Sequence, residues 1–354
     1  MNNKKLPMNH KGSSVSDGQP NMKKRILVIL LMLLAVEAIF RVFNIEDFQD
    51  DALIQDDYLG HAVRPNLDIT IQNADKMKVN VKTIGYMGIG LRDDMIVNPY
   101  VIAIGDSHTF GLAVNESDIW VNILEKKLDN EILNMGIGSY GLVQEERMIE
   151  KYALQLKPEI ILWQFSPNDY LESYRFENRN LNFTWHNLKQ FAINNIAIAK
   201  FVWSKLGAIK HDAAVVEYNE HNLSFVFEPY SFLNQADVNE EIRIGEQFGK
   251  EAIIRVKGLT DANGIKLIMI LIPSKEEIYF NLTDNYQMKL MRKFCVELGL
   301  ECIDTTEEFS RQAKTYKQLY FRKDAHLNPL GNRVVADVLY EAITGQLSKK
   351  ATDT

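Results

Sequence analysis

Ser107 and His326 are the residues of this sequence whose types and surroundings can support nucleophilic catalysis. Ser107 ends the sequence Gly105-Asp106-Ser107, which directly follows a short apolar run that predicts a buried strand. A serine hydroxyl at the carboxyl end of such a strand is exposed and can act as a nucleophile when a base reaches it. His326 is the candidate base, and Asp324, two residues earlier, can fix its tautomer and stabilise the imidazolium. These residues predict acyl-transfer chemistry.

A second group of residues can stabilise the oxyanion of a tetrahedral intermediate. The glycine-rich turn after the second predicted strand contains Gly138 and Ser139, and Asn168 follows the third predicted strand. The candidate donors are the backbone N–H groups of Ser107, Gly138 and Ser139 and the side-chain amide of Asn168. We therefore predict that the loops after these strands and the segment before the last helix form one active site.

Short apolar strands alternate with helices from residue 100 onward. Such alternation predicts a parallel sheet with helices on both faces. The carboxyl ends of parallel strands lie at one edge of a sheet, so motifs that are distant in sequence can meet there. The predicted strands are 101–104, 132–135, 159–165, 265–272 and 301–303. The predicted helices are 120–128, 142–156, 240–262, 285–298 and 330–343.

The amino terminus combines a polar tail with one apolar segment. Residues 1–22 hold little to bury and are predicted to be a disordered cytoplasmic tail. Residues 23–43 are predicted to be a retained, single-pass transmembrane anchor, since an apolar helix of eighteen residues spans about 27 Å. Basic residues precede this segment and acidic residues follow it, which predicts that the rest of the chain lies outside the cytoplasm. The alternative is a secretory signal peptide cleaved after Ala38.

Two further ranges have their own composition. Residues 44–98 are acidic and then weakly strand-like, and we predict a stalk that leads into an edge element. Arg92 is expected to pin this stalk to the catalytic domain. Residues 172–238 are rich in aromatic side chains and predict a helical insertion packed on the sheet. A cap over the substrate cleft and a surface against the membrane are the alternatives for this insertion. Residues 347–354 are interpreted as a C-terminal tail.

Composition excludes several classes of function. The formal net charge of −7 provides no basic surface for nucleic acid. The histidines are scattered, and neither His-Glu-x-x-His nor Cys-x-x-Cys occurs, so no metal site is expected. The two cysteines, Cys295 and Cys302, can form a bridge in an oxidising compartment or stay as two buried thiols. The sequence carries no signal for an oligomeric state.

The sequence thus contains four motifs, in chain order: Gly105-Asp-Ser107, the glycine turn from Asn134 to Gly141, Ser166-Pro-Asn-Asp169 and Asp324-x-His326. Together they resemble the sequence blocks of SGNH (GDSL-type) hydrolases. They occur in the family's order and at compatible spacing over about residues 100–345. The amino-terminal anchor, Gly-x-x-Leu-Arg-Asp before the first motif and Asp-Ala-His-Leu-Asn-Pro-Leu-Gly at the last are similar to a membrane-anchored branch. That branch lies near the O-acetyltransferases and esterases of cell-surface polysaccharides.

This resemblance implies a fold and a kind of substrate. The implied fold is a three-layer, flavodoxin-like α/β/α sandwich over residues 99–346, built on a parallel five-stranded sheet. The implied chemistry uses neither a metal nor an organic cofactor. The implied partner is an acyl ester, such as the O-acetyl ester of a cell-surface carbohydrate or lipid.

Two positions depart from the family's pattern. The oxyanion glycine should fall at residue 139, where this sequence has Ser139 directly after Gly138. Ser166 stands where many members have glycine. A serine amide can still donate a hydrogen bond, but a positive φ at this position would be strained without glycine. The geometry of the donors is therefore open, whereas every catalytic side chain is present.

The residues leave three functions open. Water as the second nucleophile makes the protein an esterase, and a sugar hydroxyl makes it an O-acyltransferase on an exported polysaccharide. An inactive form of the same fold would serve as a glycan-binding or assembly module. A dinucleotide-binding oxidoreductase is disfavoured, although Gly136 to Gly141 fits Gly-x-Gly-x-x-Gly. The motif follows the second strand rather than the first, and no acidic residue ends the next strand at the required distance.

Three polar residues next to the motifs are assigned supporting roles. His108 is expected to help line the cleft or simply to be tolerated. It is not expected to serve Ser107 as its base, because adjacent side chains diverge at a strand-to-helix turn. Asp106 is expected to be an acceptor that stabilises its loop. Asp169 is interpreted as a turn or helix cap.

Overall fold

The computed structural model describes residues 22–42, 52–73, 75–94, 99–179, 213–218, 221–226, 238–280, 285–315 and 317–352. These ranges include all four motifs. The predicted cytoplasmic tail up to residue 21 lies outside the described residues, as do residues 180–212, 219–220 and 227–237 of the predicted insertion and residues 353–354 of the predicted C-terminal tail.

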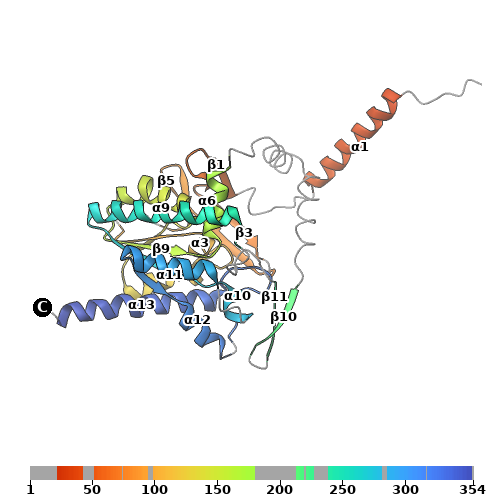
Figure 1. Ribbon diagram of the computed structural model, residues 1–354. Coiled ribbons are helices and arrows are strands. Elements are labelled where there is room, and N and C mark those ends of the chain that lie inside the picture. The colour runs from red at the N-terminus through yellow and green to blue at the C-terminus, as the bar shows by residue number, and fades with distance from the viewer. Residues whose placement is uncertain are drawn as a thin grey trace, which may run out of the picture.

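A five-stranded parallel sheet forms the centre of the fold (Figure 1). Its strands are β7 (Val101–Ile104), β8 (Ile132–Asn134), β9 (Ile160–Phe165), β12 (Lys266–Leu271) and β13 (Glu301–Asp304). Their order across the sheet is β13–β12–β9–β7–β8, and every neighbouring pair is parallel. The prediction of an α/β fold with this parallel sheet is confirmed. The strand order reverses between β7 and β9, which is where open sheets of this kind bind ligands.

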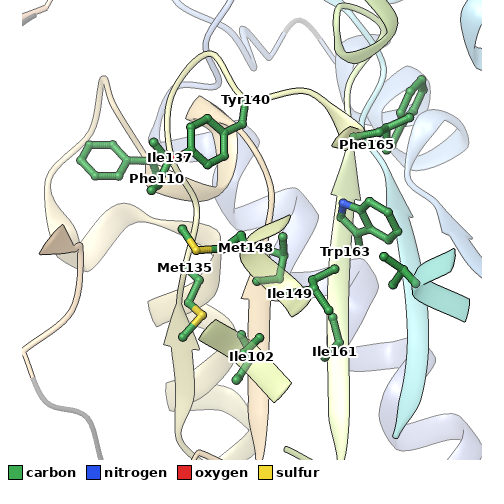
Figure 2. Packing of buried hydrophobic residues seen from close by; sticks show 14 of the residues in the cluster. Ile102, Phe110, Met135, Ile137, Tyr140, Met148, Ile149, Ile161, Trp163 and Phe165 are labelled. Atoms are coloured by element: carbon green, nitrogen blue, oxygen red, sulfur yellow. The ribbon is translucent and has the colours of Figure 1, made fainter. Parts of the chain in front are cut away.

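Alternate positions of the strands supply two separate apolar clusters, one on each face of the sheet. Ile102 and Ile104 of β7 belong to the first cluster, and Val101 and Ala103 belong to the second. Figure 2 shows part of the first cluster, around Ile102 and Trp163. Because both faces are buried, β7 is apolar throughout, β9 is apolar except for Gln164, and neither strand alternates between apolar and polar residues.

Helices between the strands cover both faces and give the fold three layers. The first cluster includes residues of α5 (Leu142–Met148), α9 (Glu240–Asn263) and α11 (Tyr286–Leu298). The second includes residues of α4 (Trp120–Leu128), α10 (Lys275–Tyr279), α12 (Thr306–Ala313) and α13 (Pro329–Thr352). A π-helix (Ile149–Ala153) and a 3-10 helix (Leu154–Leu156) continue α5. The remaining helices of this part of the chain are α3 (Ser107–Phe110), a 3-10 helix (Glu116–Asp118) and α6 (Asp169–Glu177).

Three antiparallel hairpins precede the sheet, within the range predicted as a stalk and edge element. They pair β1 (Leu53–Asp56) with β2 (Gly60–Val63), β3 (Asp68–Gln72) with β4 (Lys78–Lys82), and β5 (Ile84–Tyr86) with β6 (Ile89–Leu91). Along β4, Val79 and Val81 are buried and their neighbours are exposed. These valines, together with Ala62 and Leu91, belong to the same cluster as one face of the central sheet. The hairpins are therefore packed on the core of the main sheet.

Helix α1 (Met22–Val42) covers the segment predicted to be a transmembrane anchor. Among the described residues, no helix is both long enough and apolar enough to cross a lipid bilayer. The structure differs here from the prediction for residues 23–43, in which Glu37 and Arg41 interrupt the apolar run.

The described part of the predicted helical insertion contains a β-hairpin. Residues 172–177 form the end of α6, and β10 (Ala213–Tyr218) pairs with β11 (His221–Val226) in an antiparallel arrangement. Strands therefore occupy 213–218 and 221–226 where the sequence predicted helices, which is consistent with the β-branched and aromatic residues of these strands.

Cys295 of α11 and Cys302 of β13 form a disulfide. From the sequence, a bridge and two buried thiols were both open. The bridge closes the short connection between α11 and β13, because it joins the last turn of the helix to the strand that follows.

Candidate active site

Ser107 is the first residue of α3, three residues beyond the carboxyl end of strand β7. Asp106 caps this helix, because its carboxylate accepts a hydrogen bond of 2.8 Å from the backbone N–H of His108. Gly105 is required at the turn, since a Cβ there would clash with the side chains of Gln164 and Thr109. The turn leaves Ser107 only half-buried, while Asp106 is buried. Asp106 thus stabilises its loop, as predicted.

Gln164, which the sequence analysis missed, ties the first motif to the third. Its Oε1 accepts hydrogen bonds from the backbone N–H of Asp106 at 3.2 Å and from the hydroxyl of Thr109 at 2.9 Å. Its Nε2 donates to the hydroxyl of Ser166 at 2.7 Å. Gln164 is fully buried in β9, and its signal in the sequence is a lone amide in an otherwise apolar strand.

Asn134, at the end of β8, holds the second motif against α3. Its Nδ2 donates to the carbonyl oxygen of Thr109 at 2.8 Å, and its Oδ1 accepts from the N–H of Gly136 at 3.0 Å. A Cβ on Gly136 would clash with the backbone at Phe110, so the two segments approach as closely as glycine allows. Figure 2 shows Ile137 of this loop beside Phe110.

The turn from Ile137 to Tyr140 carries the two predicted backbone donors of this motif. The N–H of Tyr140 donates to the carbonyl oxygen of Ile137 at 3.4 Å. Gly138 lies against Ser107, since a Cβ at this glycine would be 3.7 Å from Cβ of Ser107. Ser139 has a φ of 62°, in the left-handed region. The strain expected for a serine at this glycine position is therefore present, at a cost of about 1–2 kcal/mol.

Asn168 and Asp169 follow β9, whose carboxyl end lies next to that of β7. Asn168 is half-buried, and Asp169 is buried. One carboxylate oxygen of Asp169 accepts a hydrogen bond of 2.8 Å from the backbone N–H of Ser166, so Asp169 holds the turn, as predicted. Burial raises the pKa of Asp169 well above its ordinary value, and the neighbouring carboxyl of Glu145 raises it further.

Asp324 and His326 lie on a loop closed by a bridge between Tyr320 and Leu327. The Nδ1 atom of His326 is 3.5 Å from Oδ1 of Asp324, which also accepts a 2.9 Å hydrogen bond from the backbone N–H of His326. Burial acts to raise the pKa of Asp324, but the contacts with His326 and the charge of Lys275 hold it below its ordinary value. Asp324 is therefore ionised at neutral pH and can orient the imidazole.

The ring of His326 meets the nucleophile loop at His108, the residue after Ser107. The centroids of the two imidazoles are 5.7 Å apart. This contact brings the fourth motif to the first, although more than two hundred residues separate them in the sequence. Burial lowers the pKa of His108 below its ordinary value, so the ring beside His326 is neutral at neutral pH.

Lys275 is a second residue that the sequence analysis missed. Its Nζ donates a 2.8 Å hydrogen bond to the carbonyl oxygen of Asp324, and its side chain is buried. It begins α10, shortly after the carboxyl end of β12, so it comes from the same edge of the sheet as the predicted motifs. The signal in the sequence was a lysine just beyond an apolar strand. Lys275 fixes the backbone of the loop that carries Asp324 and His326.

Comparison with known families gives one match. Residues 232–354, which include Asp324 and His326, match the family described as the SGNH hydrolase-like domain of acetyltransferase AlgX. A comparison with curated proteins finds no match.

Several solved structures are similar to this chain. A lipolytic protein of the G-D-S-L family from Desulfitobacterium hafniense has 13% sequence identity and a TM-score of 0.41, over 68% of this chain and 97% of that chain. The acetyl xylan esterase AlAXEase has 15% identity and a TM-score of 0.40, over 69% of this chain and 98% of that chain. A catalytic mutant of the acetylxylan esterase Axe2 from Geobacillus stearothermophilus has 14% identity and a TM-score of 0.38, over 70% of this chain and 94% of that chain.

The family match agrees with the resemblance that the four motifs carry. It also agrees with the prediction of an enzyme that acts on ester bonds, either an ester hydrolase or an O-acyltransferase. Residues 232–354 are therefore similar to the SGNH hydrolase-like domain that this family describes.

Proposed function

We propose that the protein is a serine-dependent ester hydrolase or O-acyltransferase in which Ser107 is the nucleophile, His326 the base and Asp324 the residue that orients the base. The observation that carries this proposal is the contact between the rings of His326 and His108, directly beside Ser107. It brings a carboxylate–imidazole pair to a half-buried serine at the switch point of the sheet.

The proposed reaction has two halves. Ser107 Oγ attacks the acyl carbonyl carbon while His326 takes the hydroxyl proton. The tetrahedral intermediate collapses, and the alcohol leaves with the proton that His326 returns, so the acyl group stays on Ser107. Water or an acceptor hydroxyl then attacks the acyl-enzyme, again losing its proton to His326. This second attack releases the acid or the new ester and restores Ser107.

The negative charge that develops on the acyl oxygen needs donors fixed in advance. Gly138 lies beside Ser107, and Asn168 follows the neighbouring strand. We assign the backbone N–H groups of Ser107, Gly138 and Ser139 and the amide of Asn168 to this role. Removal of one such donor typically lowers the stabilisation of the transition state by about 3–4 kcal/mol.

The substrate we propose is an O-acetyl ester of a carbohydrate or lipid at the cell surface. The family that residues 232–354 match is named after the acetyltransferase AlgX, which supports an acetyl ester as the substrate. Hydrolysis and transfer use the same first half-reaction, so the two differ only in whether water or a sugar hydroxyl attacks the acyl-enzyme. A module that binds glycans without turnover is the alternative that the following experiment addresses.

The test is active-site labelling of the full-length protein with a fluorophosphonate, followed by peptide mass spectrometry. We expect modification at Ser107, because an activated serine attacks the phosphorus atom and keeps it. Labelling should be lost in His326→Ala, which removes the base. Absence of labelling in a protein that is folded by circular dichroism would favour the binding-module alternative.

The cellular location is a separate proposal that rests mainly on the sequence. We propose that residues 23–43 attach the protein to the membrane and that the catalytic domain lies outside the cytoplasm. The disulfide between Cys295 and Cys302 supports an oxidising compartment, because such bridges are rare in cytosolic proteins. Alkaline carbonate extraction of cells should leave the protein in the membrane pellet. Recovery in the soluble fraction would contradict the attachment.

A further inference from the structure

Two reciprocal hydrogen bonds join the β1–β2 hairpin to the turn beside Ser107. The Nε2 atom of His61 lies 2.9 Å from the carbonyl oxygen of Gly138. In return, the hydroxyl of Tyr140 donates to the carbonyl oxygen of His61 at 2.6 Å. The rings of His61 and Tyr140 also pack edge to face, with centroids 5.1 Å apart. The hairpin therefore contacts the turn on both sides of Ser139.

The contact with Gly138 defines the protonation of the His61 ring. A carbonyl oxygen only accepts hydrogen bonds, so Nε2 must carry a proton and donate it. Burial lowers the pKa of His61, although the bond to Gly138 opposes that shift. At neutral pH the ring is therefore neutral, with its proton on Nε2.

The peptide between Gly138 and Ser139 is the central peptide of the turn from Ile137 to Tyr140. Of the two central residues only Ser139 has a φ in the left-handed region, which is the pattern of a type II turn. Rotation of this peptide by half a turn would give a type I turn, in which Ser139 has the negative φ that a residue with a side chain prefers. The strain at Ser139 thus favours rotation of the peptide.

Rotation would also reverse the N–H group of Ser139. In a trans peptide the carbonyl oxygen of one residue and the N–H of the next point in opposite directions. A bond that holds the carbonyl oxygen of Gly138 therefore holds the direction of the Ser139 N–H as well. His61 makes such a bond from the side of the hairpin.

We propose that His61 is a positioning residue of the active site, which holds the carbonyl of Gly138 and thereby keeps the N–H of Ser139 directed at the oxyanion. This inference rests on the proposed function, because an oxyanion forms only if Ser107 attacks an ester. His61 lies outside residues 99–346, so a hairpin that precedes the catalytic domain contributes to catalysis. The role assigned to it explains how a serine can replace glycine at residue 139.

Substitutions of His61 in the full-length protein test the inference through hydrolysis of p-nitrophenyl acetate. His61→Phe keeps a ring against Tyr140 but has no donor, and we expect kcat to fall about tenfold to a hundredfold with little change in KM. His61→Gln keeps an N–H donor for Gly138 and should retain most of the activity. The matched control is Gln55→Ala, because Gln55 is the exposed cross-strand neighbour of His61 and should leave kcat unchanged.

A second substitution tests the strain at Ser139 directly. Glycine adopts a positive φ without cost, so Ser139→Gly should hold the type II turn without help from His61. In the His61→Phe background we expect Ser139→Gly to recover at least half of the lost activation free energy. A residue that served only the stability of the hairpin would show no such recovery, because its loss would not act through the turn.

The outcomes separate this inference from the proposed function. A wild-type protein that neither reacts with fluorophosphonate nor hydrolyses the ester overturns the proposed function and this inference with it. An active wild type with unchanged kcat in folded His61→Phe overturns the inference alone. The inference is also overturned if His61→Phe and His61→Gln lower kcat equally and Ser139→Gly does not restore it.

Discussion

His326→Ala should lower kcat for hydrolysis of an activated acetyl ester by about 10³-fold to 10⁴-fold, with a smaller change in KM. Without an imidazole, the hydroxyl of Ser107 has no acceptor for its proton and the leaving alcohol has no donor. The residual rate would come from substrate binding and from the oxyanion donors, which the substitution leaves in place. The measurement is the steady-state hydrolysis of p-nitrophenyl acetate by the full-length protein.

The adjacent imidazole of His108 provides the discriminating control. His326 has an orienting carboxylate in Asp324, 3.5 Å from its Nδ1. Among the residues that the structure describes, no carboxylate forms an ion pair with His108, whereas Asp324 forms one with His326. His108 therefore lacks a group that would orient it as a base, and His108→Ala should cost about tenfold at most. Full activity in His326→Ala combined with its loss in His108→Ala would transfer the role of base to His108.

Arg92→Met should lower the free energy of unfolding by about 3–5 kcal/mol. Arg92 is 1% exposed, and its guanidinium donates to the carbonyl oxygens of Phe110, Gly111, Val114 and Asn80. Removal of the guanidinium takes a donor from each of these carbonyls, although Gly111 still accepts from the N–H of Val114. Each buried carbonyl left unsatisfied costs about 1–3 kcal/mol before relaxation. The measurement is urea denaturation followed by circular dichroism.

The charge of Arg92 is kept despite its burial. Burial lowers the pKa of Arg92 to about 10, and Glu116 opposes this shift, so the side chain stays cationic at neutral pH. Arg92→Lys should recover only part of the stability, because an ammonium cannot reach the same set of carbonyls in the fixed geometry of a guanidinium. The control is Arg64→Met, whose exposed side chain should change stability by less than about 0.5 kcal/mol. A loss below about 1 kcal/mol in Arg92→Met would contradict the role we give to this residue.

Arg92 and His61 together show how the amino-terminal hairpins take part in the site. Arg92 binds the carbonyl groups at the end of α3, the helix that begins with Ser107. His61 binds the turn that carries Ser139, through Gly138. The first of these links was predictable from the sequence, and the second was not. Arg92 belongs to a motif, whereas His61 is a single residue in a weakly patterned strand.

The amino-acid sequence by itself determined the layered fold and the candidate catalytic residues. Buried parallel strands are continuous apolar runs and amphipathic helices repeat every three to four residues, so both are visible over short windows. The helix predicted at 120–128 is α4 (Trp120–Leu128), and the strand predicted at 159–165 is β9 (Ile160–Phe165). Ser107 could be identified because a reactive side chain and a glycine directly follow a predicted strand. Asp324 and His326 could be identified because they directly precede the last predicted helix.

Only the tertiary structure decided which polar residues support the site. Each of three supporting residues contacts a partner that is distant in the sequence. Lys275 binds Asp324, 49 residues away, and His61 binds Gly138, 77 residues away. Gln164 binds Asp106, at a separation between these two. Their partners depend on strand order and on how the hairpins pack, which no local pattern records. The pairing of Cys295 with Cys302 was likewise open until α11 and β13 were placed side by side. Local periodicity therefore specifies the elements, and long-range packing specifies the geometry in which they do chemistry.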